Sequence, residues 1–557
     1  MKSGNILKTN QENNRLKFCK IERERVLRMS KNIIIGGAWP YANSSLHLGH
    51  IAGLISGDVL ARYFRLKGDN VLYVSGSDTH GTPITERARK EKVNPKEIAS
   101  KYHEEFTEMF NKLNFSYDLY SKTYDPYHEE KVKELFLKLY KNGYIYEKIE
   151  EQAYCENCKK FLQDRDIVLT CPECGKETKG DQCDNCLHVP TEQELLEGNC
   201  IVCGSKLEKK NNKVLYLKLS AFQKEIEEHT KEVENSWRIN ARNETWKYLK
   251  QGLQDRAVTR DLDWGIEIPL PGYEDKRMYV WIDAVLGYLT DTMKICEENG
   301  MNWEDFWKEG HNNKIYMCHG KDNIVFHSII LNALLLGQKE DYHLVDTIVS
   351  AEYLNFNDQK FSKSKGIGMT ALEACDLYDS DSIRYHLVSN GPEKKDTNFT
   401  VEDFKNVHNT EILNKFGNLV NRTLNFKGLD EIPAGTMDSE MESLVKETYK
   451  KAGENIEKLE FKAAVQNIME LVESANKYYD SSKPWVCKNE DINQFNNIIY
   501  TCSVIIANLS NLFEPIMPTA CEKIRNYLDI KDKKWEYITV PAGLKLTTIE
   551  PLFERLK

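Results

Sequence analysis

A short apolar segment that runs directly into a histidine-containing helix start restricts the folds open to this chain more than any other feature. Residues 32–38 form the apolar segment, residues 40–43 (Pro-Tyr-Ala-Asn) follow as a turn, and His47-Leu48-Gly49-His50 opens what reads as a helix. A helix start offers unpaired backbone N–H groups and the positive end of the helix dipole to an anion. His47 and His50, one turn apart, share a face, and Gly49 leaves room for a flat base to approach the backbone. The pattern predicts a strand–turn–helix unit that binds phosphate.

A second motif, Lys360-Phe361-Ser362-Lys363-Ser364, lies on a loop rich in Lys, Ser and Gly. Taken alone, each motif has an ordinary explanation, because histidines on helices and charged surface loops are common. Taken in this order, the two motifs predict an enzyme that activates a carboxylate with ATP. The loop would close over the triphosphate, and its ammonium groups would neutralise the charge that develops as pyrophosphate leaves.

The cysteines are the most specific metal-binding signal in the chain. Eight of the fifteen cysteines form four Cys-x-x-Cys pairs, enough for two closed tetrahedral zinc sites. A redox role is the alternative, but four pairs in one polar stretch favour metal. We expect a nested arrangement, in which the two inner pairs hold one structural zinc and the two outer pairs hold the other. The predicted metal ligands are Cys155, Cys158, Cys171, Cys174, Cys183, Cys186, Cys200 and Cys203.

The distribution of apolar residues predicts a split α/β body, an insertion and a helical C-terminal part. Strands are expected at 70–75, 314–318 and 343–349 and an amphipathic helix at 101–112, an alternation typical of a parallel sheet covered by helices. The predicted fold class is therefore α/β: a split Rossmann-like nucleotide-binding domain with a zinc-binding insertion and a C-terminal α-helical bundle. The expected domains are a disordered N-terminal extension at 1–30, the two Rossmann halves at 31–147 and 246–350, a connective insertion at 148–245, the lysine loop with a stem-contact region at 351–400, and the helices at 401–557.

Charge and hydropathy exclude several classes of protein. The net charge of −10 argues against a protein that coats nucleic acid non-specifically, although Lys360, Lys363 and Lys365 form a local basic patch. No apolar run approaches the length needed to span a membrane, and the N-terminus lacks the apolar core of a secretory signal. Thiols in metal-binding patterns fit a reducing compartment, so we expect a cytoplasmic protein.

Polar side chains at strand ends mark a candidate binding cleft. Asp78 follows a predicted strand, where a carboxylate could pair with a substrate ammonium group; the alternative is a turn aspartate that caps the next helix. Residues 319–323 (His-Gly-Lys-Asp-Asn) follow another strand, and His327 lies one turn further on. Trp281, Ala284 and Tyr288 share a helical face, which on spacing alone is more often core than a binding site.

The C-terminal helices carry a candidate nucleic-acid surface. A helical face of buried residues is expected at Phe461, Val465, Ile468, Val472, Ala475 and Tyr479. Asn418 and Arg422 lie one turn apart on another predicted helix, and Trp485 follows a proline that ends a helix. Trp485 could plug the bundle, or it could be an exposed platform on which a base stacks.

These motifs resemble those of the class I aminoacyl-tRNA synthetases, and from about Lys31 onward the chain resembles the methionyl-tRNA synthetases. His47–His50 is similar to the His-Ile-Gly-His element of the class, and 360–364 is similar to its Lys-Met-Ser-Lys-Ser loop. The stretches that carry the closer resemblance are 39–43, 77–83, 279–284, 319–322 and His327. The four cysteine pairs and Phe361 resemble the archaeal and eukaryotic-like branch, which carries two zinc knuckles.

The resemblance implies a role for each matching position. Catalysis would rest on His47, His50, Lys360 and Lys363. The ATP-binding residues would be His47, Gly49, His50, Lys321, Asp322, Lys360, Lys363 and Ser364. The methionine-binding residues would be Ala38, Trp39, Tyr41, Asp78, Trp281, Ala284, Tyr288 and His327, with Asp78 on the amino group. Asn418, Arg422 and Trp485 would read the CAU anticodon.

Two residues depart from the family pattern. Trp39 stands where the family usually has Leu, and Val285 stands where Pro is common. A bulkier wall at Trp39 predicts a narrower methionine pocket. The chain also ends soon after the predicted bundle, so we expect no additional C-terminal tRNA-binding domain.

The activity that the resemblance implies is ATP-dependent ligation of L-methionine to the 3′ end of methionine tRNA, initiator and elongator, through methionyl-adenylate. Mg-ATP is the expected co-substrate, zinc the expected structural metal, and a monomer without membrane attachment the expected state. Three alternatives stay open: a class I synthetase for another amino acid, a non-catalytic RNA-binding paralogue, and a zinc-ribbon scaffold whose partner is a protein. The insertion is short for a hydrolytic editing domain, which disfavours isoleucine, valine and leucine.

Overall fold

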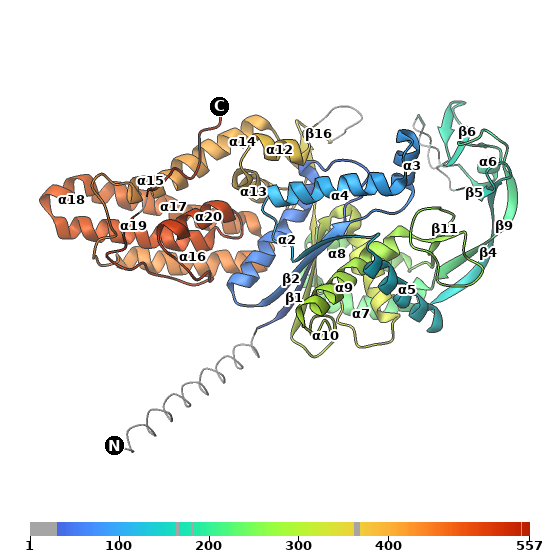
Figure 1. Ribbon diagram of the computed structural model, residues 1–557, viewed down its shortest axis with the longest axis horizontal. Coiled ribbons are helices and arrows are strands. Elements are labelled where there is room, and N and C mark those ends of the chain that lie inside the picture. Colours follow the sequence, from blue (N-terminus) through green and yellow to red (C-terminus); the bar gives the residue numbers. More distant parts are fainter. Residues whose placement is uncertain are drawn as a thin grey trace, which may run out of the picture.

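The computed structural model describes residues 30–162, 166–180, 183, 185–186, 188, 190–360, 368–546 and 548–557. The predicted N-terminal extension lies outside these residues except for Ser30. Figure 1 shows an α/β body at the centre, a strand-rich insertion on one side of it and a helical bundle on the other. The α/β class with a C-terminal helical part, as predicted, is confirmed.

A five-stranded parallel sheet forms the centre of the α/β body. Its strand order is β14-β13-β1-β2-β3, with β1 paired to β2 on one side and to β13 on the other. The order of the strands therefore reverses at β1, and folds of this kind bind ligands at the carboxyl ends of the strands beside such a reversal. The strands are β1 (Asn32–Gly37), β2 (Asn70–Ser77), β3 (Leu119–Lys122), β13 (Asn313–Gly320) and β14 (Thr347–Ala351).

One predicted strand is shorter than expected. We expected a strand at 343–349, but β14 begins only at Thr347. The Asp346 side chain accepts hydrogen bonds from the backbone N–H of Ile315 (2.8 Å) and lies 2.8 Å from Nε2 of His343. Hydrogen bonds to the Asp346 side chain therefore hold the segment before β14. In a longer strand, backbone groups would make such hydrogen bonds.

The two faces of the sheet are buried under different helices. Ile33 and Ile35 belong to the core that includes helix α2 (Leu48–Leu66), whereas Ile34 belongs to the core that includes α9 (Val280–Asn299). This alternation is the period of two that a strand covered on both faces must show. The other helices of the body and its edges are α3 (Thr82–Glu91), α4 (Pro95–Lys112), α5 (Pro126–Lys141), α7 (Gln223–Val233), α8 (Ile239–Gln251), α10 (Glu304–Trp307), α11 (Leu331–Leu336), α12 (Ala371–Leu377) and α13 (Ser380–Ser389).

The insertion is a long antiparallel ribbon with small sheets at its far end. Strand β4 (Ile145–Cys155) pairs with β9 (Glu208–Leu217) from Ile145↔Leu217 to Tyr154↔Glu208. Residues 219–245, which we assigned to the insertion, do not project with it. Ile226, Trp237 and Ala241 are buried in the core on the α9 face of the sheet. The remaining elements between β4 and β9 are β5 (Lys160–Phe161), β6 (Ile167–Thr170), β7 (Glu177–Lys179), α6 (Glu192–Leu196) and β8 (Asn199–Cys200).

The C-terminal part is a helical bundle whose core is continuous with the α2 side of the α/β body. All six residues of the predicted face on α17 are buried. The helices are α14 (Val401–Val407), a π-helical segment (His408–Gly417), α15 (Asn418–Leu424), α16 (Ser439–Glu457), α17 (Phe461–Ser482), α18 (Pro484–Glu490), α19 (Ile492–Leu512) and α20 (Pro518–Tyr527). None of the helices in the described ranges combines the length and apolar character needed to span a lipid bilayer.

Candidate active site

The two histidines of the first motif cap helix α2 reciprocally. His47 is the N-cap residue, with extended backbone (φ −116°, ψ 168°), and its Nδ1 accepts from the backbone N–H of Gly49 at 3.1 Å. Nδ1 of His50 accepts from the backbone N–H of His47, also at 3.1 Å, and the two ring centroids lie 3.8 Å apart. Because Nδ1 is an acceptor in both neutral rings, the ring proton must sit on Nε2. The motif thus presents two N–H donors beside the start of a helix, as phosphate binding requires.

A cavity of about 380 Å³ lies beside this helix start. Gly53 allows α2 to lie against the end of β13, because a Cβ at that position would be 3.3 Å from the Gly320 backbone nitrogen. Asn323 belongs to the polar stretch 319–323 that sequence analysis selected. Glu352 and Tyr353 also line the cavity, although sequence analysis did not select them; their place just after the predicted strand at 343–349 was the available signal. The lining residues are Ala38, Trp39, Pro40, His47, Gly49, His50, Gly53, Leu54, Gly320, Asp322, Asn323, Glu352, Tyr353, Leu354 and Asn355.

Lys321 and Asp322 are held by a polar network at the rim of this cavity. Nζ of Lys321 pairs with Glu352 (2.7 Å) and Asp396 (2.9 Å). The Asp322 carboxylate accepts from the Tyr353 hydroxyl at 2.5 Å. Lys321 therefore joins the ends of two strands to the segment before β17 (Thr397–Phe399), which restricts its reach toward a ligand.

Of the predicted lysine loop, only the beginning is described. Lys360 ends strand β16 (Gln359–Lys360), which pairs with β15 (Leu354–Phe356). Because Leu354 borders the cavity, β15 leads from the cavity directly to the loop. Lys363 and Ser364 lie outside the described residues, as does the side chain of Lys360.

Asp78 is buried at the carboxyl end of β2. Its backbone N–H donates to Pro40 and its backbone carbonyl accepts from Ala42, so the ends of β1 and β2 are tied together. Its side chain caps no helix: α3 begins after Gly81 without a side-chain cap, and the carboxylate instead accepts from the backbone N–H of His80 at 3.3 Å. Burial first, and then the charge of Asp283, raise the pKa of Asp78 well above its ordinary value. The capping alternative is therefore wrong, and the carboxylate is buried beside the turn that follows β1.

The predicted aromatic residues form two contacting groups. The Trp281 ring stacks on Phe326 at 3.8 Å and meets Tyr41 edge-on at 5.8 Å. The Tyr288 hydroxyl lies 2.8 Å from Nε2 of His327, whose Nδ1 lies 2.8 Å from the carbonyl of Asn323. Since a carbonyl only accepts, Nδ1 of His327 carries the proton and Nε2 accepts from Tyr288.

A second cavity adjoins the first through Asp322. It measures about 440 Å³ and is walled in part by Trp281 and Phe326. Phe326 was missed from sequence because it belongs to no periodic pattern; its place beside His327 was the only signal. Ala284 is buried on the same helix as Trp281 and Tyr288.

Trp39 lines the cavity, but its indole is largely buried within the fold. The narrower methionine pocket expected from this residue stays a prediction. The six-membered ring of Trp39 lies between Gly76 of β2 and Gly287 of α9, where added Cβ atoms would come within 2.6 Å and 2.3 Å of it. The indole is 8% exposed and meets Tyr288 edge-on. Two glycines therefore make the slot that accommodates the larger ring. Val285 is buried in helix α9, which continues through it without interruption.

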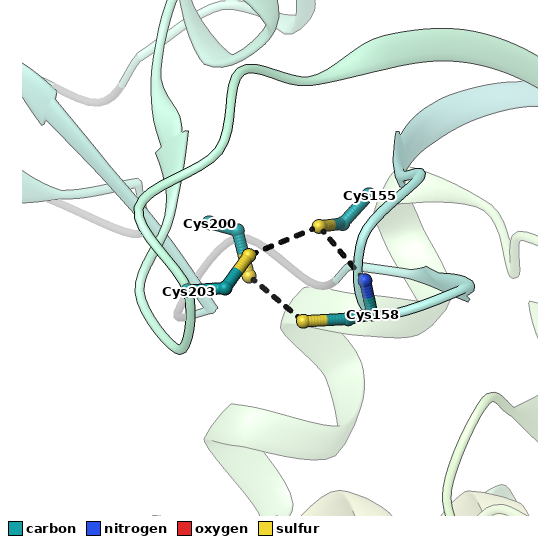
Figure 2. Close-up of side chains that lie close together, drawn as sticks. All are labelled: Cys155, Cys158, Cys200 and Cys203. Carbon is teal, nitrogen blue, oxygen red and sulfur yellow. Dashed lines mark hydrogen bonds between the residues drawn. The ribbon is translucent and has the colours of Figure 1, made fainter.

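The eight cysteines form two separate clusters in the predicted nested pairing. Figure 2 shows the outer cluster, made of Cys155, Cys158, Cys200 and Cys203. Sγ–Sγ distances are 3.4 Å for Cys155–Cys203 and 3.8 Å for Cys158–Cys200 in the outer cluster. The inner cluster, made of the four cysteines from 171 to 186, has distances of 3.5 Å and 3.6 Å. Four sulfurs around zinc at about 2.3 Å lie about 3.8 Å apart, so both clusters match the size of a tetrahedral site.

Arg422 and Trp485 meet across Tyr479 at the far end of the bundle. The Arg422 guanidinium lies 4.1 Å from the Tyr479 ring centroid and pairs with Asp480 at 2.7 Å. Trp485 is 50% exposed, with its ring 6.3 Å from that of Tyr479, so it is not a buried plug. Asn418 is exposed one turn earlier, in a groove that Pro551, Leu552 and Phe553 also line.

Comparisons with known proteins agree with this architecture. Residues 33–424 match the family of class I tRNA synthetases (M), and residues 438–541 match the anticodon-binding domain of tRNA ligases. Methionine–tRNA ligase 1 of Alkaliphilus oremlandii is 47% identical over 531 residues, and the methionine–tRNA ligase of Bacillus cereus strain B4264 is 46% identical over 533; each comparison covers 94% of this chain and 97% of the relative.

A solved structure shares the fold. The methionyl-tRNA synthetase of Mycobacterium tuberculosis, in complex with methionyl-adenylate, superposes with a TM-score of 0.76 at 23% identity, covering 94% of this chain and 100% of the other. These relatives are bacterial, and the assignment to the archaeal and eukaryotic-like branch stays a prediction. Two family models in the expected order and near-full-length identity of 46–47% lead to one conclusion: the chain belongs to the methionyl-tRNA synthetase family of class I aminoacyl-tRNA synthetases.

Proposed function

We propose that this protein ligates L-methionine to the 3′ end of initiator and elongator methionine tRNA through a methionyl-adenylate intermediate, with Mg-ATP as co-substrate. The observation that carries the proposal is the juxtaposition of a phosphate-binding helix start after β1 and the buried carboxylate Asp78 after β2. Neighbouring strands lie about 4.8 Å apart, so one small molecule can span an ammonium site and a phosphate site there. The near-full-length similarity to methionine–tRNA ligases supports the amino acid.

In the first step, a carboxylate oxygen of methionine attacks the α-phosphorus of ATP, and pyrophosphate leaves. The Nε2–H groups of His47 and His50 and the start of α2 stabilise negative charge on the phosphate oxygens as it develops. Lys360 and Lys363, on the loop that follows β15, would neutralise the departing pyrophosphate. Catalysis is positioning and charge stabilisation, with no covalent bond to the enzyme.

In the second step, a hydroxyl of the terminal tRNA ribose attacks the carbonyl carbon of the mixed anhydride, and AMP leaves. Asp78 holds the α-ammonium group throughout. The thioether side chain would lie against Tyr41, Trp281, Ala284 and Tyr288, an apolar and aromatic wall suited to a polarisable sulfur. Since Tyr288 and Asn323 occupy both ring nitrogens of His327, that imidazole is fixed rather than free to titrate.

The two cysteine clusters would hold one structural zinc each, and the zinc would fix the tip of the ribbon without entering the reaction. Arg422 and Trp485 would contact the anticodon at the opposite end of the molecule, with Asn418 one turn away. We propose that the protein works as a monomer in the cytoplasm, where unmodified thiols and tRNA are both present.

Methionine-dependent exchange of labelled pyrophosphate into ATP tests the proposal. We expect exchange with L-methionine and little with leucine or norleucine at equal concentration. Exchange driven by another amino acid would reassign the specificity. An absence of exchange with every amino acid, in protein that still binds methionine tRNA, would favour the non-catalytic paralogue.

A further inference from the structure

Asp283 is a buried carboxylate that none of the roles above employs. It lies in the first turn of α9, is fully buried, and its Oδ2 lies 2.9 Å from Nδ1 of His80. Its other oxygen, Oδ1, has no hydrogen-bond partner among the described residues. A buried carboxylate oxygen without a donor is costly, and such atoms in native proteins call for a ligand or a function.

The position of this oxygen relates it to Asp78. His80 contacts both carboxylates: its backbone N–H donates to Oδ1 of Asp78 and its ring binds Oδ2 of Asp283. The charges of both aspartates, after burial, raise the pKa of the Tyr41 hydroxyl, so both also lie near Tyr41. His80 and Tyr41 therefore both lie beside the two buried carboxylates.

The surroundings supply no cation for this pair. In the described part of the chain, neither carboxylate has an ion pair with lysine or arginine, and burial lowers the pKa of His80 to about 4, so His80 is neutral at pH 7. Tyr41 lies near both aspartates, and Tyr279 lies near Tyr41. Glu129 of α5 adds negative charge beside both His80 and Asp283. Arg260 lies over the Tyr279 ring instead.

We propose that Asp283 is a second carboxylate for the α-ammonium group of the amino-acid substrate, which Asp78 and Asp283 hold together. An ammonium group has three N–H donors, so it can satisfy Oδ1 of Asp283 and the Asp78 carboxylate at once. Its positive charge replaces the cation that the pair lacks. This inference rests on the proposed role of Asp78 in binding that ammonium group.

The arrangement also predicts a proton balance. Burial raises the pKa of both aspartates. The charge of Asp283 raises the pKa of Asp78 further, whereas the backbone N–H of Ala284 lowers the pKa of Asp283 and the charge of Glu129 raises it. We therefore expect the pair to hold a proton in the absence of ligand. When the ammonium group binds, both carboxylates ionise and that proton leaves to solvent. Binding of an amine ligand should therefore release a proton, whereas binding of the same ligand without its amino group should not.

The test compares Asp283→Asn with Asp291→Asn in the full-length protein. Asp291 lies eight residues further along the same helix, is equally buried, and also has a carboxylate oxygen without a partner, so it is a matched control. Binding of L-methioninol, which keeps the ammonium group, and of 4-(methylthio)-1-butanol, which is the same molecule without it, is measured by calorimetry.

We expect Asp283→Asn to weaken binding of L-methioninol by about 10- to 100-fold, the size of a lost charged hydrogen bond, and to leave binding of 4-(methylthio)-1-butanol within about twofold. Asp291→Asn should change neither. Equal weakening of both ligands, or of neither, would overturn the proposal and leave Asp283 a structural residue. If Asp283→Asn does not fold, the wild-type protein decides: L-methioninol binding in two buffers of different ionisation enthalpy must show proton release, and its absence rejects the pair. Failure of the proposed function itself would appear separately, as wild-type protein without methionine-dependent exchange.

Discussion

Single residues set the shape of the amino-acid side of the cleft, and Trp39 is the clearest case. A tryptophan beside the cleft would be expected to fill it, yet the ring is turned into a slot between β2 and α9. The slot exists because positions 76 and 287 carry no side chain, so three residues distant in sequence act as one packing unit.

This unit predicts an overpacking effect. Gly287→Ala should destabilise the protein by about 1–3 kcal/mol, because the new methyl group would collide with a ring that has no other space. The thermal midpoint of unfolding should fall accordingly. Adding Trp39→Leu to Gly287→Ala should restore part of the lost stability. If the two changes in the free energy of unfolding simply add, the residues do not interact.

Residue-level prediction from sequence located features that depend on local geometry. His47 and His50 lie at a helix start and Asp78 follows a strand, as expected, whereas their roles in catalysis and binding stay predictions. Asp283 and Phe326 could not be found in this way, because their partners, His80 and Trp281, lie 203 and 45 residues away and only the tertiary fold brings them together.

At the scale of elements, the ribbon β4–β9 separates the two cysteine clusters from the core. The cysteines of the inner cluster are near one another in sequence, whereas the ribbon brings the two pairs of the outer cluster together. No cysteine belongs to both clusters. The two sites should therefore load independently.

Elemental analysis tests that independence. The wild-type protein should contain about two zinc ions per chain, Cys171→Ser should retain about one, and Cys375→Ser, a cysteine on α12 outside both clusters, should retain both. Loss of both ions from Cys171→Ser would mean that the clusters fold as a single unit.

The end of the bundle offers a second element-level prediction. Trp485→Ala should lower kcat/KM for methionine tRNA by about 10- to 100-fold, since stacking of one base on an aromatic ring contributes about 1–3 kcal/mol. Pyrophosphate exchange should stay near the wild-type rate. Ile492→Ala, which alters another exposed apolar residue on the neighbouring helix, serves as the control, and a similar loss in that variant would point to a general packing defect.

The limits of sequence at this scale are seen in residues 219–245. Their polar composition resembles the insertion that precedes them, and five buried apolar residues were too few to reveal a return to the core. These are Leu219, Phe222, Ile226, Trp237 and Ala241. The short β14 was overestimated for a related reason: the apolar residues of 343–349 fit a strand, but the Asp346 side chain takes over hydrogen bonds that a longer strand would make through its backbone.

At the scale of the whole molecule, one buried arginine joins the α/β body to the bundle. Arg384 on α13 pairs with Asp58 of α2 at 2.5 Å, and its guanidinium also donates to the carbonyls of Leu113, Pro515 and Ile516. Both charged side chains are fully buried. Removing one partner of a buried ion pair costs about 3–5 kcal/mol when the other charge is left unpaired. Asp58 also pairs with Arg62 at 2.8 Å, so the loss of Arg384 should cost less than that.

We therefore expect Arg384→Met to lower the thermal midpoint and to reduce tRNA charging more than pyrophosphate exchange, because the bundle would lose its fixed position. The pair also makes stability depend on pH. Burial alone would raise the pKa of Asp58, but Arg62, Arg384 and hydrogen bonds from Ser116 outweigh it and hold that pKa well below its ordinary value.

A carboxyl group with a lowered pKa stabilises the fold fully above its unfolded pKa of about 4, and that stabilisation is lost as the pH falls toward the folded value. Asp58→Asn should consequently flatten the decline of the thermal midpoint between about pH 4 and pH 2. If the thermal midpoint of Asp58→Asn falls with pH as steeply as that of the wild-type protein, other carboxylates cause the acid sensitivity.

The strand order has a consequence for how the protein is made. Asn32 of β1 pairs with Asn313 of β13. One edge of β1 therefore stays unpaired until the ribosome has added 281 further residues (313 − 32). At 5–20 residues per second this delay is roughly 15 to 60 s. During that time the first half of the sheet carries an open apolar edge, while the cysteine ribbon, whose pairings are local, can already close around its metal. Zinc supply and chaperone capture during synthesis should therefore influence the yield of active protein more than the final stability does.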